Sequence, residues 1–252
     1  MEITLKMFLI VCPLVFLGGL VDSIAGGGGL ISLPAYLLAG LPPHFAIGTN
    51  KLSSAAGTAI SAVRFCKNKF VDWGVAIPSI LLALIGSALG ANLALLVDER
   101  IMKYILVIIL PVVAFYVLKR KSLETRTEEK KIPRNRVYFI ACIASFIVGA
   151  YDGFYGPGTG SFLILIYTGL AKMDIKKASG NTKLVNLASN IAALVTYLTN
   201  GKIIFFLGIT AAVFGIAGNY IGSGLVIKNG QKVMRPIILV VLALLFIKVI
   251  VD

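Results

Sequence analysis

The stretch DSIAGGGGLISLP, residues 22–34, places an ionisable Asp22 and four consecutive glycines directly after an apolar run. The composition of the chain identifies the environment of this stretch. Of the 252 residues, 58% are hydrophobic and 14% are charged, whereas a soluble domain has roughly 25% charged residues. The charges are clustered between long apolar runs, and runs of about 18 or more apolar residues are typical of transmembrane helices. The sequence therefore predicts an all-α polytopic membrane protein.

Eight apolar segments are strong candidates for membrane spans. They are 7–24, 46–65, 74–97, 101–118, 137–150, 184–199, 203–226 and 236–251. Two further apolar segments, 30–41 and 161–171, follow glycine-rich stretches and are too short for comfortable full spans. We expect them to form broken, re-entrant helices. The first span also resembles a secretory signal peptide, but its pattern recurs in mid-chain, where no signal is cleaved.

An internal repeat divides the chain into two homologous halves. GGLVDSIAGGGG (18–29) aligns with VGAYDGFYGPGT (148–159), and AIGTNKLSSAAGT (46–58) aligns with ASGNTKLVNLASN (178–190). The alignment places Asp22 on Asp152 and Lys51 on Lys183. We therefore predict two membrane repeats, with one broken helix in each.

A charged segment separates the two repeats. Residues 119–136 contain eight Lys/Arg and three Glu, which is typical of an exposed linker. The sequence thus predicts a first repeat over 1–118, a cytoplasmic linker over 119–136 and a second repeat over 137–252.

The positive-inside rule favours one of two membrane topologies. With the linker in the cytoplasm and the in-span Lys248 left out, four crossings per half place 13 Lys/Arg inside and 10 outside. Five crossings per half give 18 inside and 5 outside, because 172–183 and 228–235 move to the cytoplasmic side. We favour five crossings and inverted repeats with both termini outside; four crossings and parallel repeats are the alternative.

The broken helices predict where a substrate binds. A helix that ends inside the membrane leaves N–H and C=O groups unpaired, which is tolerated only within protein or around a polar cavity. Glycines let such groups approach a ligand closely, and the helix N-termini that follow favour an anion. Interrupted segments at matching places in two inverted halves are typical of the binding site of a secondary transporter.

Candidate substrate-binding residues lie in the glycine loops and at the start of the spans that follow them. They are Gly26, Gly27, Gly28, Gly29, Gly156, Gly158, Thr159 and Gly160 in the loops, and Asn50, Lys51, Thr182, Lys183, Asn186 and Asn190 in the spans. We expect the loops to offer backbone N–H groups and the second set to offer side-chain donors to an anion. For the second set, the alternative is helix capping and snorkelling at the membrane surface.

Asp22 and Asp152 are candidate proton-coupling groups. An ionisable residue inside a membrane is costly and functional by default. Two ionised carboxylates beside a bound anion would repel it strongly in a medium of low dielectric. We therefore expect at least one of them to be protonated during part of a transport cycle. The alternative is that each aspartate caps the helix that begins after its glycines.

Two other features have a structural interpretation. Gly86-x-x-x-Gly90 and Gly218-x-x-x-Gly222 have the small-xxx-small spacing of closely packed membrane helices. His44 is the only histidine, so no histidine-based metal site can be repeated in both halves. We expect His44 at a helix interface, with a proton-transfer role as the alternative, and we predict neither a metal ion nor a cofactor.

The motifs of both halves resemble a known family. D-x-x-x-G-G-G-G-x-x-x-x-P, L-P-P-H and A-x-x-T-N-K-L in the first half, with D-G-F-Y-G-P-G-T-G-S-F and N-T-K-L-x-N-x-A-S-N in the second, are similar to the sulfite exporter TauE/SafE family. The resemblance covers nearly the whole chain. It implies a prokaryotic inner-membrane carrier of seven or eight spans that moves small sulfur-containing or organic anions, such as sulfite, sulfoacetate and sulfonates.

The internal repeat, the broken helices and the family resemblance together predict a secondary-active transporter of small anions in the inner (plasma) membrane. An anion channel or uncoupled permease of the same fold is the alternative. The chain contains no G-x-x-x-x-G-K-[ST] and no H-E-x-x-H motif, so we expect no enzyme activity and an energy supply from protons or another coupling ion. The net charge of +13 is explained by loop topology and anionic lipid rather than nucleic acid. The expected partners are the substrate and the bilayer, with a homo-oligomer left open.

Overall fold

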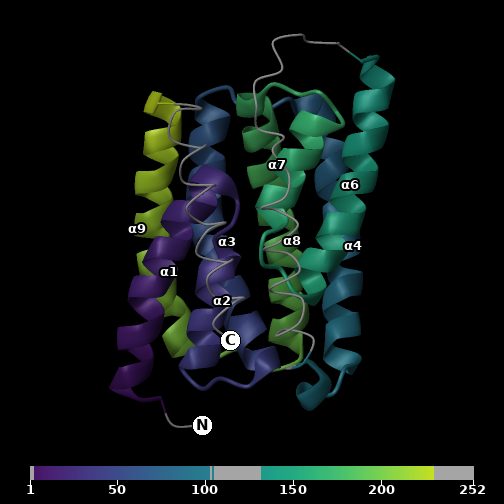
Figure 1. Cartoon of the computed structure of the whole chain (residues 1–252). Helices are drawn as coiled ribbons and strands as arrows, with labels where there is room; N and C mark the ends of the chain where they lie inside the picture. The colour runs from purple at the N-terminus through teal and green to yellow at the C-terminus, as the bar shows by residue number, and fades with distance from the viewer. Residues whose placement is uncertain (1–2, 103, 105–131, 230–252) are drawn as a thin grey trace.

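The computed structural model describes residues 3–102, 104 and 132–229, and within these ranges the chain is helical, with no β-strand (Figure 1). The helices are α1 (Leu5–Ala25), α2 (Gly29–Leu38), α3 (Pro43–Lys67), α4 (Trp73–Leu96), α6 (Arg134–Phe154), α7 (Thr159–Gly169), α8 (Ile175–Thr199) and α9 (Phe205–Asn229). The predicted all-α fold is confirmed for this part of the chain. The predicted spans 101–118 and 236–251 and most of the linker 119–136 lie outside the described residues, save for positions at their edges.

Four of the described helices, α1, α4, α6 and α9, are long and apolar enough to cross a membrane. The two 25-residue helices α3 and α8 are roughly 37 Å long at 1.5 Å per residue, but they carry many polar side chains. Figure 1 shows these two helices at the centre of the bundle, between α1 and α9 on one side and α4 and α6 on the other. The prediction of strong apolar spans is thus confirmed for four helices, while α3 and α8 are more polar because they are interior.

A short helix follows each glycine-rich stretch, as predicted. Helix α2 has 10 residues and α7 has 11, so neither is long enough to cross a bilayer core of about 30 Å by itself. Helix α1 ends at Ala25 and α2 begins at Gly29, while α6 ends at Phe154 and α7 begins at Thr159. Both interruptions therefore lie within the bundle, at equivalent places in the two halves of the sequence.

Glycines bring helices of the two halves into close contact. A Cβ atom at Gly86 or Gly90 of α4 would collide with the backbone of α6 at Phe146 or Ala150. A Cβ atom at Gly218 of α9 would likewise collide with the backbone of α1 at Phe16. The helix-packing interpretation of these glycines is confirmed. The fourth described helix of each half packs against the first helix of the other half.

The central helices α3 and α8 run in opposite directions. At one end of the bundle, the Lys177 ammonium of α8 donates to the carbonyls of Lys69 and Val71, just after α3, at 2.9 Å each. At the other end, the Ile204 amide, just after α8, donates to the Thr49 hydroxyl near the start of α3 at 3.1 Å. Figure 1 shows the same reversal for α1 and α6 and for α4 and α9.

The outer surface of the bundle is apolar. On α4, Ile77, Leu81, Ile85, Leu89 and Leu93 follow one another at intervals of four residues, and each is more than half exposed. Because residues four apart share one helix face, they form a continuous apolar stripe. Such a stripe is unfavourable in water and suits contact with lipid.

Basic side chains gather at one end of the bundle. This end, where α3 finishes and α6 and α8 begin, carries Arg64, Lys67, Lys69, Arg134, Arg136, Lys172, Lys176, Lys177 and Lys228. Arg134 forms a 3.2 Å ion pair there with Asp72. The described residues at the opposite end include Lys6, Arg100 and Lys202, beside the acidic Asp98 and Glu99. We call the first of these the basic end.

Candidate functional site

The two glycine loops of the breaks meet in the middle of the bundle. The Ser161 amide at the start of α7 donates to the Gly26 carbonyl at 3.2 Å, and the Ser161 hydroxyl donates to the Ala25 carbonyl at 2.8 Å. A Cβ atom at Gly26 would lie 2.6 Å from the Cα atom of Gly160. The glycines are therefore required for the contact between the two loops, a role that the sequence alone did not reveal.

Backbone conformation explains three of the loop glycines. Gly26, Gly156 and Gly158 have φ angles of +76°, +102° and +85°, a region that residues with a Cβ atom rarely adopt. Gly28 is different, because its φ of −58° is ordinary right-handed helix. Its lack of a side chain matters sterically, since a Cβ atom there would collide with Asp22 and with the Gly18 carbonyl.

Two buried Lys–Asp ion pairs flank the breaks, and each pair joins the two halves. Lys51 of α3 lies 2.7 Å from Asp152 of α6. Lys183 of α8 lies 2.8 Å from Asp22 of α1. The lysine side chains are only 2% and 1% exposed, so these charges are held inside the protein. Desolvation makes such a pair expensive to bury, and a pair that is present in both halves points to a functional role.

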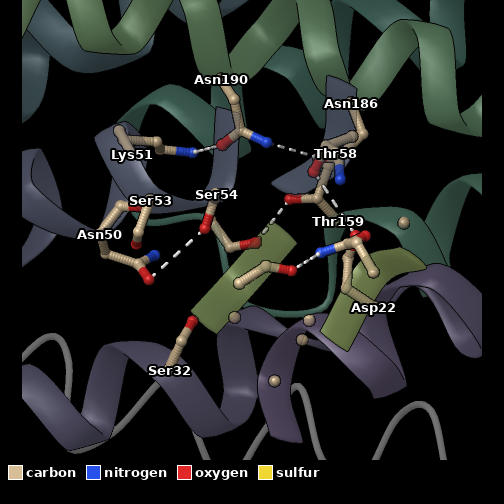
Figure 2. A pocket seen from close by; sticks show the side chains of 18 of the residues that line it. Asp22, Ser32, Asn50, Lys51, Ser53, Ser54, Thr58, Thr159, Asn186 and Asn190 are labelled. Atoms are coloured by element: carbon tan, nitrogen blue, oxygen red, sulfur yellow. Dashed lines mark hydrogen bonds between the residues drawn. The ribbon is translucent and has the colours of Figure 1, made fainter. Parts of the chain in front are cut away.

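Hydroxyl and amide groups complete the surroundings of the Lys51–Asp152 pair. The Asp152 carboxylate accepts hydrogen bonds from Thr159 and Ser189, each at 2.7 Å. Lys51 donates to the side-chain oxygen of Asn190 at 3.1 Å, and Figure 2 shows these two side chains pointing toward each other across the pocket. The polar groups thus form one connected network that reaches from α3 to α8.

A polar pocket of about 500 Å³, its open mouth included, lies beside this network. Its walls are glycine backbone, small polar side chains and the charged side chains of Asp22, Lys51 and Asp152, with Val15 as the one branched apolar residue among them. Figure 2 shows Ser32 of α2, Asn50, Ser53 and Ser54 of α3 and Asn190 of α8 around it. A cavity of this chemistry suits a small, strongly polar solute rather than an apolar one.

Most of the predicted site residues line this pocket. Asp22, Gly26, Gly28, Gly29, Asn50, Lys51, Asp152, Gly156, Thr159, Gly160, Asn186 and Asn190 do so. Gly27, Gly158, Thr182 and Lys183 do not line it. Gly158, the N-cap of α7, and Thr182 of α8 are buried, and Lys183 is paired with Asp22.

Sequence reasoning missed several wall residues. They are Val15, Gly18, Gly19, Ser32, Ser53, Ser54, Thr58, Gly215 and Asn219. Ser54 and Thr58 could have been predicted from the sequence. They follow the predicted Asn50 at intervals of four residues and therefore share its face of α3. Asn219 of α9 had a weaker signal as an amide in an apolar helix, where it accepts a 3.1 Å hydrogen bond from Ser61.

Two alternatives from the sequence are wrong. Lys51 and Lys183 do not snorkel to the membrane surface, because α3 and α8 begin about two turns before them and both side chains are buried. Nor does either aspartate cap a restarting helix: within the described residues the Asp22 carboxylate accepts from the side chains of Lys183 and Thr58, and the Asp152 carboxylate accepts from the side chains of Thr159 and Ser189. The N-caps of α2 and α7 are Gly28 and Gly158.

His44 lies at the end of the bundle opposite the basic end, away from the pocket. Its Nε2 atom is 3.0 Å from the carbonyl oxygen of Ala94, and its Nδ1 atom is 3.5 Å from Glu99. It therefore sits at a helix interface, between the start of α3 and the end of α4. Across the residues that the structure describes, no group of three His, Cys, Asp or Glu side chains gathers to hold a metal ion.

Interrupted helices that meet at a buried polar pocket are the arrangement in which secondary transporters hold their substrates. Here they occur in a bundle with an apolar outer surface and four helices able to cross a membrane. Fold and site define the class of protein as an α-helical membrane transporter.

The chain belongs to the sulfite exporter TauE/SafE family, whose sequence model matches residues 11–249. The resemblance indicated by the motifs is confirmed. The chain is 36% identical to the "Probable membrane transporter protein YfcA" of Escherichia coli (strain K12) over 94% of its own length and 87% of that protein. It is 32% identical to the "Probable membrane transporter protein ORF9" of Sinorhizobium sp, over 94% of this chain and 90% of that one.

A third relative is the "Probable membrane transporter protein" of Haemophilus influenzae (strain ATCC 51907 / DSM 11121 / KW20 / Rd). It is 31% identical over 100% of this chain and 98% of its own length. No solved structure matches the chain.

Proposed function

We propose that this protein is a secondary-active transporter of small anions, sulfur-containing or organic, such as sulfite, sulfonates or sulfoacetate. It works in the inner (plasma) membrane as a multi-pass protein and is driven by protons or another coupling ion. The family and the names of the relatives support transport. The anionic substrate and the coupling are inferred from the site.

One observation carries the proposal: a polar pocket lies where both interrupted helices meet, beside two lysines that are each held by an aspartate of the other half. A lysine ammonium and several amide and hydroxyl donors are the groups that bind an oxyanion. Asp22 and Asp152 neutralise the charges of Lys183 and Lys51 and are the proposed coupling groups. Of the predicted substrate-binding residues, we retain those that line the pocket: Gly26, Gly28, Gly29, Asn50, Lys51, Gly156, Thr159, Gly160, Asn186 and Asn190.

We further propose that the two halves are inverted repeats with five crossings each, counting each short helix as one. The order of long, short, long and long helices in α1 to α4 recurs in α6 to α9, which supports this. The opposite directions of equivalent helices and the crossed ion pairs also support it. The basic end corresponds to the cytoplasmic side, since basic residues are enriched there. Repeats of this kind permit alternating access around a fixed site.

The test is transport by purified protein in liposomes. A thermal-shift screen against sulfite, thiosulfate, sulfonates and carboxylates selects the anion, and uptake of the labelled anion is then measured with and without an imposed pH gradient. We expect accumulation above the external concentration when the gradient is present, and its collapse when a protonophore is added. Anion flux that only equilibrates, whether a proton gradient or a gradient of another ion is imposed, contradicts secondary-active transport and favours the channel or uncoupled permease.

A further inference from the structure

The Asp152 carboxylate is held as a bound oxyanion would be. Three donors from three helices converge on it: Lys51 of α3 and Ser189 of α8 at Oδ2, and Thr159 of α7 at Oδ1, all at 2.7 Å. The side chain is 3% exposed. A cation with two hydroxyl groups is a donor set that suits a sulfonate or carboxylate group of a solute.

The second ion pair differs in a way that matters for binding. Lys183 donates both to the Asp22 carboxylate and to the backbone carbonyl of Asp22, so it is fastened to the end of α1 and does not line the pocket. Lys51 does line the pocket, and its other hydrogen-bond partner, Asn190, lines it too. Lys51 is therefore the lysine of the two that a solute in the pocket can reach.

We propose that Asp152 occupies the anion site in the absence of substrate, and that a substrate oxyanion binds Lys51 by displacing the Asp152 carboxylate, which takes up one proton as it leaves. The inference rests on the proposed anion transport and adds its coupling step. Before binding, the Lys51 ammonium is paired with the Asp152 carboxylate. After one anion and one proton have bound, the ammonium is paired with the anion and Asp152 is a neutral acid. No charge accumulates in the site.

The surroundings of Asp152 explain why the proton must accompany the anion. Lys51 is the cation within ion-pair distance of Asp152 among the described residues. Two tyrosines, Tyr151 on its own helix and Tyr197 on α8, also interact electrostatically with Asp152, and a neutral hydroxyl cannot replace a cation. Asp22, which is paired with Lys183, is another acid that interacts electrostatically with Lys51. A carboxylate that lost Lys51 would be a buried, unpaired charge beside an anion, which is very costly.

Calorimetry with methanesulfonate tests the exchange, because this anion stays ionised across the pH range used. Binding to the purified protein is measured in buffers with different ionisation enthalpies, so that the protons taken up per anion are counted. We expect about one proton per anion, and an affinity that falls by up to about tenfold for each unit rise in pH. Binding without proton uptake, or no binding at acidic and neutral pH alike, overturns the proposal.

Two variants and a control sharpen the test. Asp152→Asn should bind methanesulfonate with no proton uptake and an affinity independent of pH, whereas Lys51→Gln should not bind it. Asp72→Asn, which removes a partly exposed carboxylate that pairs with Arg134 at the basic end, should keep the proton count of the native protein. Proton uptake that persists in Asp152→Asn contradicts the exchange. That result would overturn the exchange but not the proposed transport, which the liposome assay tests separately. If a variant fails to fold, the proton count on the native protein still tests the exchange.

Discussion

At the scale of single residues, the crossed Lys–Asp pairs are the main finding. Lys51 and Asp152 are both almost fully buried, so each depends on the other for charge compensation. Removing one partner of a buried pair costs roughly 3–5 kcal/mol, while replacing both partners with neutral groups is often close to neutral. This asymmetry provides a direct test of the pairing.

We predict that Lys51→Met lowers the stability of the detergent-solubilised protein by about 3–5 kcal/mol, because Asp152 is left buried without a counter-ion. The double variant Lys51→Met/Asp152→Asn should recover most of the loss. Arg134→Met is the matched control, since Arg134 pairs with Asp72 at the surface with a side chain 65% exposed; it should leave stability almost unchanged, because solvent screens such a pair. Thermal unfolding measures all three. A Lys51→Met protein as stable as the native one would show that the pair is not formed.

The sequence predicted which ionisable residues matter but not how they pair. The internal alignment made Lys51 equivalent to Lys183 and Asp22 equivalent to Asp152, and it placed all four near the breaks. Whether a lysine meets the aspartate of its own half or that of the other half depends on how the halves pack. Local sequence contains no information on that contact, so the crossed arrangement required the structure.

At the scale of elements, the interrupted helices were predictable and their boundaries less so. The apolar runs and glycines identified α2 and α7 because both signals are local. The start of α8 was missed: the apolar run begins at 184, but the helix begins at Ile175. Its first turns contain Lys176 and Lys177 and polar residues, which an apolarity criterion excludes. Asp174 accepts hydrogen bonds from the amides of both lysines, a local N-cap signal that marks the true start.

The glycine loops should not tolerate a β-branched side chain. We predict that Gly158→Val and Gly28→Val each abolish transport while the protein still reaches the membrane. At Gly158 the positive φ makes valine strained by about 1–3 kcal/mol, and at Gly28 a Cβ atom collides with Asp22 and α1. Uptake into cells or liposomes, with abundance in the membrane measured in parallel, is the readout.

Gly169→Val is the control for the loop variants. Gly169 ends the same short helix α7, and a Cβ atom there meets no other atom within 4 Å, so transport should be normal. Normal transport by both Gly158→Val and Gly28→Val would mean that the loops serve helix packing alone.

At the scale of the whole molecule, the basic end sets the proposed orientation in the membrane. The positive-inside count favoured the same side for the linker and for residues 172–183. The structure places Arg134, near the end of the linker, and Lys176 at one end of the bundle. The sequence allowed this orientation to be predicted because membrane topology depends on the sum of many loop charges rather than on one contact.

Cysteine labelling tests this orientation. In a chain whose three native cysteines are replaced by serine, a cysteine at the exposed Lys176 should not react with a membrane-impermeant reagent added to intact cells. A cysteine at Asn200, exposed at the other end of α8, should react. Reaction of the Lys176 position from outside would contradict the inverted arrangement with five crossings per half.

The central claim is that one protein-internal acid couples proton movement to anion movement, and a pair of assays on reconstituted Asp152→Asn protein tests it most directly. Asparagine has the shape of the neutral acid but cannot release a proton. We predict that this variant exchanges labelled for unlabelled anion across the liposome membrane at a rate comparable to that of the native protein. With an imposed pH gradient it should accumulate no anion above equilibrium, whereas the native protein does. Uphill accumulation by Asp152→Asn at the native rate would contradict the account.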